Sequence, residues 1–229
     1  VSPKLSQTSN NIFLNEKLLA RVKSIYDKKE QLNLSTEDAK LLEDLYESFK
    51  ANGTTLNKDD KEKYRKLSMD LSMLTLQFDQ NALKDKNRFE LLITDENELS
   101  GLPESARDAA AMLAKSKDKD GWLFNLSAPS YIPFMRYSDK RDLREKMYRE
   151  YMSVGNKGDE FDNKDIIKKI VNIRLEIAQL MGFKNYAEYA LEHTMAKNSA
   201  NVYKLLNQLL EAYKPIAINE YNAVEGFAL

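Results

Sequence analysis

Apolar residues recur every three or four positions along most of the chain, which is the spacing of one face of an α-helix. Leu18, Val22 and Ile25 form such a stripe between residues 10 and 31. A longer stripe, expected between about residues 57 and 84, has a spacing that suits packing against an antiparallel neighbour. Its members are Tyr64, Leu67, Leu71, Leu74 and Phe78. The pattern predicts a mostly α-helical chain.

Polar residues at set spacings mark where several of these helices should begin. Ser35 and Asp38 have the spacing of a capping box. Asn185 and Glu188 have the same spacing before a short helix, and Ser199 is the expected cap of the last long helix.

A regular apolar face is also expected in the helix before Gly182, and Pro215 should interrupt or kink the last helix. The apolar face comprises Ile166, Ile170, Ile173, Ile177 and Leu180.

The helical spacing changes in the middle of the chain. Residues 88–94 and 121–126 are short, rich in β-forming residues and bounded by turn residues. They flank a helical segment with Pro103 near its first turn, so we expect a strand–helix–strand insert with two strands. The stretch "SAPSYIPF" (127–134) has two prolines and should be a rigid loop or a short interrupted helix.

The chain is therefore expected to be a single helical fragment over residues 1–229. Within it we distinguish a helical hairpin region (1–87), a strand–helix–strand insert (88–126) and a helical region (127–229) that continues into a missing part. The chain starts without Met and stops without a polar tail, so both ends are expected to be cuts.

Composition removes several classes of function. Hydrophobic residues make up 42% and charged residues 31%, as in a globular protein with a solvated surface. The 35 basic and 36 acidic residues alternate, which leaves no basic stripe for nucleic acid. No apolar run reaches the roughly 20 residues that cross a bilayer. We therefore expect neither a nucleic acid nor a membrane as partner.

One histidine and no cysteine limit the metal chemistry open to the chain. A zinc site needs three or four Cys, His or carboxylate ligands at one point, and the motif H-E-x-x-H is absent. The pair Glu192-His193 has the reverse order. We expect His193 to lie on a helix that it helps to pack or cap.

Other candidate residues also favour structural roles. Ser130 has neither a histidine nearby in sequence nor a G-x-S-x-G context. The acidic segment Asp159, Glu160, Asp162 and Asn163 lacks the spacing of a calcium loop, so helix capping explains it better. Adjacent carboxylates without an apolar pocket are ordinary solvated charges. These pairs are Glu43-Asp44, Asp59-Asp60, Asp95-Glu96 and Asp159-Glu160.

Aromatic residues gather beside the two prolines of the stretch 127–134. They can form a small core under a loop, or a rigid wall near a peptide-binding channel. The residues concerned are Tyr131, Phe134, Met135 and Tyr137.

Four motifs in order resemble one known family. They are a G-L-P turn with an Ala-rich helix, a P-S-x-x-P-F loop, an R-x-L-R-E segment (141–145) and an L-x-G-F-x-N-Y-A run followed by M-A-K. Together they resemble the N-terminal part of the peptidyl-dipeptidase branch of the thimet oligopeptidase family, which are zinc metallopeptidases. The resemblance covers nearly the whole chain.

The resemblance implies a helical lobe lining a deep channel for short peptides. It also implies zinc, held by an H-E-x-x-H helix and a downstream glutamate that lie beyond Leu229. We thus expect no catalytic or metal-binding residue in this chain and no zinc on this fragment, and the residues that contact the substrate are unknown. The fragment should be inactive without its own C-terminal catalytic region. Apolar surface meant for that region should be exposed. It includes Leu209, Leu210, Ile216, Ile218 and Phe227.

Three functions remain open at this stage. The first is a zinc peptidyl-dipeptidase that releases C-terminal dipeptides, the second an oligopeptidase that cleaves internally, and the third a non-catalytic helical adaptor. The expected compartment is the cytoplasm, with the periplasm or export as the alternative, because the native start is missing.

Overall fold

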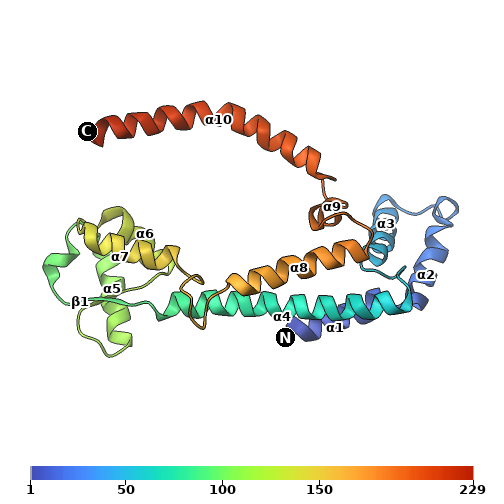
Figure 1. Cartoon of the computed structure of the whole chain (residues 1–229), viewed down its shortest axis with the longest axis horizontal. Coiled ribbons are helices and arrows are strands. Elements are labelled where there is room, and N and C mark those ends of the chain that lie inside the picture. The colour runs from blue at the N-terminus through green and yellow to red at the C-terminus, as the bar shows by residue number, and fades with distance from the viewer. Residues whose placement is uncertain (1, 229) are drawn as a thin grey trace. The chain divides into compact units, whose positions relative to one another are not determined.

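The computed structural model describes residues 2–228, and helix dominates them (Figure 1). Over this range it has ten α-helices, two short 3-10 helices and one two-stranded sheet, which confirms the expected mostly α class with a small β insert. None of the helices in this range combines the length and the apolar character that a bilayer crossing needs.

The chain forms two compact units. The first holds residues 1–71 and 172–229, and the second holds residues 72–171. Helices α4 (Lys58–Arg88) and α8 (Lys164–Leu180) each belong partly to both units. The three-part division expected from the sequence stays a prediction.

The first unit is entirely helical. Besides its shares of α4 and α8, it contains α1 (Ser2–Phe13), α2 (Glu16–Tyr26), the 3-10 helix η1 (Lys29–Gln31), α3 (Thr36–Ala51), α9 (Tyr186–Leu191) and α10 (Ser199–Ala228).

Local polar residues begin these helices largely as the sequence predicts. The Ser35 hydroxyl accepts a hydrogen bond from the Asp38 backbone N–H at 3.1 Å, which starts α3. The Asn185 side chain accepts from the Glu188 N–H at 3.0 Å, which starts α9. Each bond satisfies an N–H group that the first helical turn leaves free, so both predicted caps are confirmed.

A small apolar cluster holds the first unit together. Tyr64 and Leu67 from the predicted stripe of α4 pack with Leu14 and with Ile177 of α8. Partly buried apolar residues surround this cluster, among them Leu56, Leu71, Ile173, Leu180, Met181 and Tyr189. The predicted faces of α4 and α8 therefore meet each other in this unit.

The second unit contains the only strands between residues 2 and 228. Strand β1 (Leu91–Ile93) pairs antiparallel with β2 (Trp122–Phe124), with Leu92 opposite Leu123. Helix α5 (Glu104–Ser116) connects them, which confirms the predicted strand–helix–strand insert. The remaining elements are η2 (Glu96–Leu99), α6 (Ala128–Tyr137) and α7 (Arg141–Met152).

The core of the second unit is larger and better closed. Its fully buried members come from the sheet, the turns beside it and the two following helices. They include Ile93, Leu99, Leu126, Phe134 and Met147. Phe124 and Phe134 pack edge to face, with ring centroids 4.8 Å apart.

The proline-rich stretch forms helix α6, in agreement with the helical one of the two expected conformations. Pro129 lies in the first turn, where its missing N–H has no partner to lose. Pro133 lies inside the helix, which continues to Tyr137 without a break. The expected interruption is therefore absent from α6.

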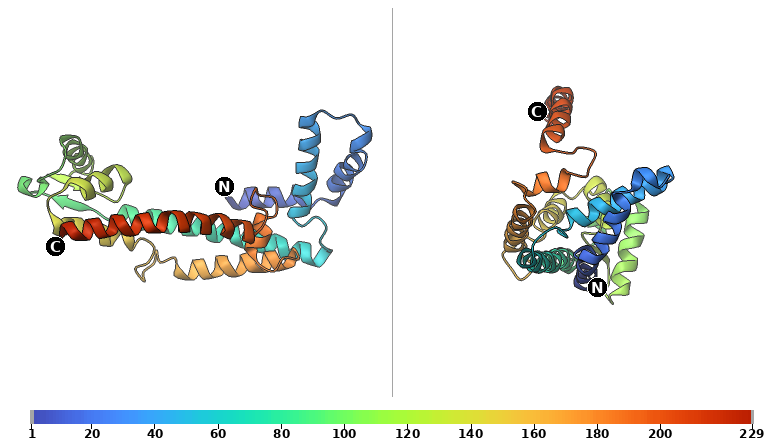
Figure 2. Two further views of the ribbon diagram at one scale, coloured as in Figure 1. Left: turned by 90° about the horizontal axis from the view of Figure 1, so that it is seen from above. Right: turned by 90° about the vertical axis from the view of Figure 1, so that its right-hand side faces the viewer.

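The cap residue of the long helix α10 lies one position earlier than predicted. The side chain of Asn198, and not that of Ser199, accepts the hydrogen bond from the Asn201 N–H, at 2.9 Å. Pro215 lies within α10 and does not end it. The left view of Figure 2 draws α10 as one unbroken ribbon.

Candidate functional site

The histidine His193 lies in the turn after α9, and not on a helix as the sequence analysis expected. Helix α9 ends at Leu191. Thr194 donates its backbone N–H and its hydroxyl to the Leu191 carbonyl, at 3.0 and 2.8 Å. Local hydrogen bonds of Thr compete with helix continuation, which explains why the chain turns here.

The side chains of His193 and Glu192 form an open pair. The His193 Nε2 atom lies 3.3 Å from a Glu192 carboxylate oxygen, and the two side chains are 46% and 48% exposed. Catalytic acids and bases are usually tuned by burial or by several convergent charges. Both side chains of this pair are about half exposed and only one carboxylate meets the imidazole, so the pair lacks the burial and the convergent charges of a catalytic site.

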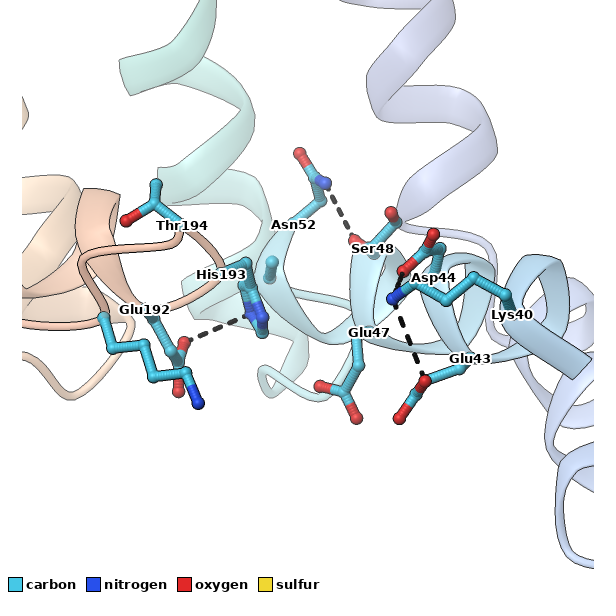
Figure 3. Close-up of a pocket in the computed structure, with 11 residues that line it drawn as sticks. Lys40, Glu43, Asp44, Glu47, Ser48, Asn52, Glu192, His193 and Thr194 are labelled. Carbon is cyan, nitrogen blue, oxygen red and sulfur yellow. Dashed lines mark hydrogen bonds and ion pairs between the residues drawn. The ribbon is translucent and has the colours of Figure 1, made fainter.

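An open cleft of about 430 Å³ lies between this turn and helix α3 (Figure 3). The turn contributes Glu192, His193, Thr194 and Lys197. Helix α3 and the residue that follows it contribute Lys40, Glu43, Asp44, Glu47, Ser48, Ala51 and Asn52.

The polar groups of the cleft are largely bonded to close neighbours on their own helix. Lys40 lies 2.7 Å from an Asp44 oxygen and 3.8 Å from a Glu43 oxygen. The hydrogen bond to Asp44 raises the pKa of the Lys40 ammonium. Asn52 donates to the Ser48 carbonyl at 2.8 Å. The cleft is thus a solvated surface with its charges paired locally.

A zinc ion does not fit the residues that the structure describes. Across residues 2–228, no three His, Cys, Asp or Glu side chains are grouped so that they could hold a metal ion. The chain has one histidine and no cysteine. A zinc site with three protein ligands cannot be built around His193 and Glu192 alone.

The acidic segment before α8 uses its oxygens in turns. Asp159 accepts from the Phe161 N–H at 3.0 Å and pairs with Arg88, whose hydrogen bond lowers the Asp159 pKa. Asp162 accepts from the backbone N–H groups of Gly158 and Lys164, at 2.6 and 2.9 Å. Of these backbone donors only Lys164 begins a helix, so Asp162 acts at the start of α8, whereas Asp159 closes a turn before it.

Two of the other adjacent carboxylate pairs also lie at helix starts. Asp60 is in the first turn of α4 and accepts from the Asn57 side chain at 2.7 Å. Asp95 precedes η2 and accepts from the Asn97 N–H at 2.9 Å. Asp59, Asp95 and Glu96 are exposed and Asp60 is half-buried, so neither pair has the apolar burial that would set two carboxylates apart chemically.

A buried carboxylate that the sequence analysis missed lies at Asp85. Its side chain is fully buried and accepts from the Gly155 N–H at 2.7 Å. Lys157 and Arg88 approach the other oxygen, at 3.2 and 2.7 Å. Asp85 lies 70 positions before Gly155, so local sequence patterns contain no signal for this contact. With all its donors in place, Asp85 anchors the loop between α7 and α8.

Helix α6 combines packing residues with one open side. Phe134 is fully buried, whereas Tyr131 and Met135 are partly buried and pack against the same core. Tyr131 stacks on Tyr151, with ring centroids 4.3 Å apart. The Ser130 hydroxyl accepts from the Asn125 N–H at 3.0 Å, a structural bond.

A shallow apolar cleft of about 240 Å³ lies beside the start of α6. Its lining comes from α5, β2, the turn after β2 and the start of α6, and includes Ala106, Ala109, Leu113, Phe124, Ser127 and Pro129. The packing of Tyr131, Phe134 and Met135 confirms the expected small core, but it lies under a helix and not under a loop. A wall facing a peptide channel stays a prediction.

Comparison with known proteins points to one family. The model of the family described as "Peptidase family M3" matches residues 134–228. The chain is 34% identical to Oligopeptidase A of Salmonella typhimurium over 230 residues, which is 99% of this chain and 34% of that protein. It is 36% identical over 213 residues to the Probable cytosolic oligopeptidase A of Arabidopsis thaliana, covering 90% of this chain and 30% of that protein.

A relative with a different printed name matches nearly as far. Dipeptidyl carboxypeptidase of Escherichia coli is 30% identical over 226 residues, which is 98% of this chain and 33% of that protein. The chain spans about a third of the length of these curated relatives.

Proposed function

Because the chain belongs to peptidase family M3, we propose that the intact protein hydrolyses short peptides. The observation that carries this proposal is the 34% identity to Oligopeptidase A, which continues over 99% of the chain. A likeness of that extent reflects a shared fold and not one short motif. The same alignment includes both compact units and α10.

In this proposal the chain is a helical lobe that forms a wall of the peptide channel and does not itself cut peptides. The two clusters of buried apolar residues support a rigid scaffold. The open cleft at His193 has locally paired charges and no convergent set of catalytic groups. Catalysis then depends on the intact protein's own catalytic region.

Zinc is the metal that the family resemblance implies, and its ligands would lie outside these residues. A bound zinc ion would polarise the peptide carbonyl and lower the pKa of a water molecule for attack. The described residues offer no group that fits it. The chain's own contribution is therefore to bind and orient the peptide and to limit its access.

Two modes of cleavage fit the relatives. The 34% identity to Oligopeptidase A exceeds the 30% identity to Dipeptidyl carboxypeptidase, which favours internal cleavage of short peptides. Release of C-terminal dipeptides, the first expectation from the sequence, stays the second candidate. A cytoplasmic location accords with the cytosolic name of one relative, while another is named organellar.

The test uses the intact protein with a short peptide carrying a fluorophore and a quencher. We expect hydrolysis that a zinc chelator abolishes and added zinc restores. The same peptide with a free and with an amidated C-terminus separates the modes, because a dipeptidase needs the free carboxylate and an internal peptidase does not. Mass spectrometry of the products identifies the cleaved bond.

The 229-residue chain is the matched control in the same assay. We expect no hydrolysis and no stoichiometric zinc on the purified chain. Zinc bound tightly to it would overturn the assignment of the metal ligands to another region. An intact protein that folds but cleaves no peptide would favour the helical adaptor. His193→Gln in the intact protein should leave its zinc content unchanged.

A further inference from the structure

Helix α10 presents its apolar side chains to solvent between residues 203 and 227. Every residue from 203 to 227 is exposed. Phe227 is 94% exposed, Val224 68% and Ile216 52%. This confirms the expected exposure of apolar residues in the last helix, and an exposed apolar surface of this length is typical of an interaction site.

Most of the apolar residues of α10 occupy one side of the helix. At about 100° per residue they fall within an arc of about 180°, whereas Pro215 and Ile218 fall on the opposite side. The apolar arc includes Leu206, Leu209, Tyr213, Ile216, Val224 and Phe227. The opposite, polar arc includes Asn207, Gln208, Glu211, Asn222 and Glu225.

One carboxylate lies in the middle of the apolar arc. Glu220 falls at the centre of that arc, and its neighbours one turn away are all apolar. These neighbours are Ile216, Ala217, Ala223 and Val224. A partner that covers the apolar arc must therefore bury Glu220 as well. A buried carboxylate is strongly unfavourable unless a cation or several hydrogen-bond donors meet it.

We infer that the apolar arc of α10 docks onto the part of the intact protein outside these 229 residues, and that this part places a basic side chain against Glu220. The inference rests on the proposed function only in taking the intact protein to have the length of its relatives. They are about three times as long as the stretch that they share with this chain.

Two observations favour the protein's own chain over a second copy as the occupant. The family match runs over residues 134–228 and so includes α10, which makes the helix part of what family members share. An arc of about 180° is also wider than the narrow seam by which two helices pair in a coiled coil. A helix that is apolar over half its circumference fits a groove between several neighbours, as in the interior of a larger domain.

The four residues of one turn allow a direct test in the intact protein. Leu206 and Leu209 lie on the apolar arc, and Asn207 and Gln208 lie on the polar arc. Each is replaced in turn by cysteine, and the rate of maleimide labelling at that site is followed by peptide mass spectrometry. The described part of the chain has no cysteine of its own to compete.

We expect labelling at positions 206 and 209 to be slower by about 100-fold or more than at 207 and 208. All four rates should be independent of protein concentration. Equal rates around the turn would overturn the docking inference. Protection that disappears on dilution to a monomer would also overturn it, because the occupant would then be a second copy.

A second experiment addresses Glu220. Glu220→Leu should lower the thermal midpoint of the intact protein by about 5 °C or more, because it leaves a basic partner buried without its charge. Glu220→Gln should have a smaller effect in the same direction. Glu225→Leu on the polar arc is the matched control and should change the midpoint little. An unchanged or higher midpoint for Glu220→Leu would overturn the pairing.

The outcomes separate this inference from the proposed peptidase function. If the intact protein cleaves peptides but is labelled at equal rates around the turn, the proposed function stands and the docking surface is refuted. If the apolar arc is protected from labelling but the intact protein hydrolyses no peptide, the docking surface stands and the proposed function is refuted.

Discussion

The second unit and helix α10 contain similar apolar side chains in opposite surroundings. Phe134 of α6 is fully buried, and Phe227 of α10 is 94% exposed. In the second unit, β1 and β2 pair antiparallel and bring α5 and α6 onto one core. In α10, by contrast, every residue from 203 to 227 is exposed. The difference shows that an apolar helix face specifies the need for a partner and not where that partner comes from.

The two phenylalanines provide the largest contrast in stability. Phe134→Ala should lower the free energy of unfolding of the second unit by about 3–5 kcal/mol, through lost burial and the cavity left behind. Phe227→Ala in the same 229-residue chain should change it by less than about 0.5 kcal/mol. Trp122, the one tryptophan, packs against the core of the second unit and reports its unfolding in urea by fluorescence.

A large loss of stability from Phe227→Ala in the isolated chain would show that the chain covers α10 in solution. The contrast between a buried Phe134 and an exposed Phe227 would then not hold in solution. In the intact protein, where α10 is inferred to be docked, we expect Phe227→Ala to lower the stability of the fold.

Buried charge gives a second contrast within the second unit. Asp85 is fully buried, and Asp159, which shares Arg88 with it, is 34% exposed in its side chain. Asp85→Ala should lower the free energy of unfolding by about 3 kcal/mol, because Gly155 and Lys157 lose their acceptor in a buried site.

Asp159→Ala is the control for this measurement and should cost less than about 1 kcal/mol, as expected of a surface ion pair. Urea titrations followed through Trp122 compare the two variants. Equal losses would mean that the burial of Asp85 has no energetic consequence. Asp85 already has its donors within the unit, which is the state that Glu220 of α10 is inferred to reach only in the intact protein.

Much of the fold could be predicted because its signals are local. The cap residues Ser35 and Asn185, the apolar stripe of α4 and the turn residues around the two strands each depend on neighbours a few positions away. The two strands could be predicted from their β-forming residues and bounding turns, but their antiparallel direction was not predicted, because a helix between two strands more often joins parallel ones.

The errors arose where two local signals compete or where the contact is distant. His193 was expected on a helix, but the Thr194 hydroxyl ends α9 first. Asn198 and Ser199 are both good helix caps, and spacing alone does not choose between them. The contact between Asp85 and Gly155 joins residues 70 positions apart. The candidate site was harder still, because the residues that perform the chemistry are proposed to lie outside this chain, where its local patterns carry no signal for them.

The corrected cap of α10 leads to a smaller and local effect. Asn198→Ala should remove the hydrogen bond to the Asn201 N–H and destabilise the start of α10 by about 1 kcal/mol. Because α10 is exposed, the change should speed amide hydrogen exchange in its first turns without altering the unfolding of the second unit. Ser199→Ala is the matched control and should leave exchange nearly unchanged. The reverse order would restore Ser199 as the cap.

The smallest expected effect concerns the charged rim of the second unit. Glu90 accepts hydrogen bonds from Lys117 and Lys119, and these hold its pKa below the ordinary value of 4.5. A carboxylate with a lowered pKa in the folded state stabilises the fold above the unfolded pKa and loses that contribution as the pH falls through the folded pKa.

Glu90→Gln should therefore cost at most about 1 kcal/mol at pH 7, and less in high salt. The difference between the two proteins should shrink as the pH falls below 4.5. Urea titrations at neutral and acidic pH, followed through Trp122, measure that difference. A gap that widens in acid would assign the stabilisation to the packing of Glu90 and not to its charge.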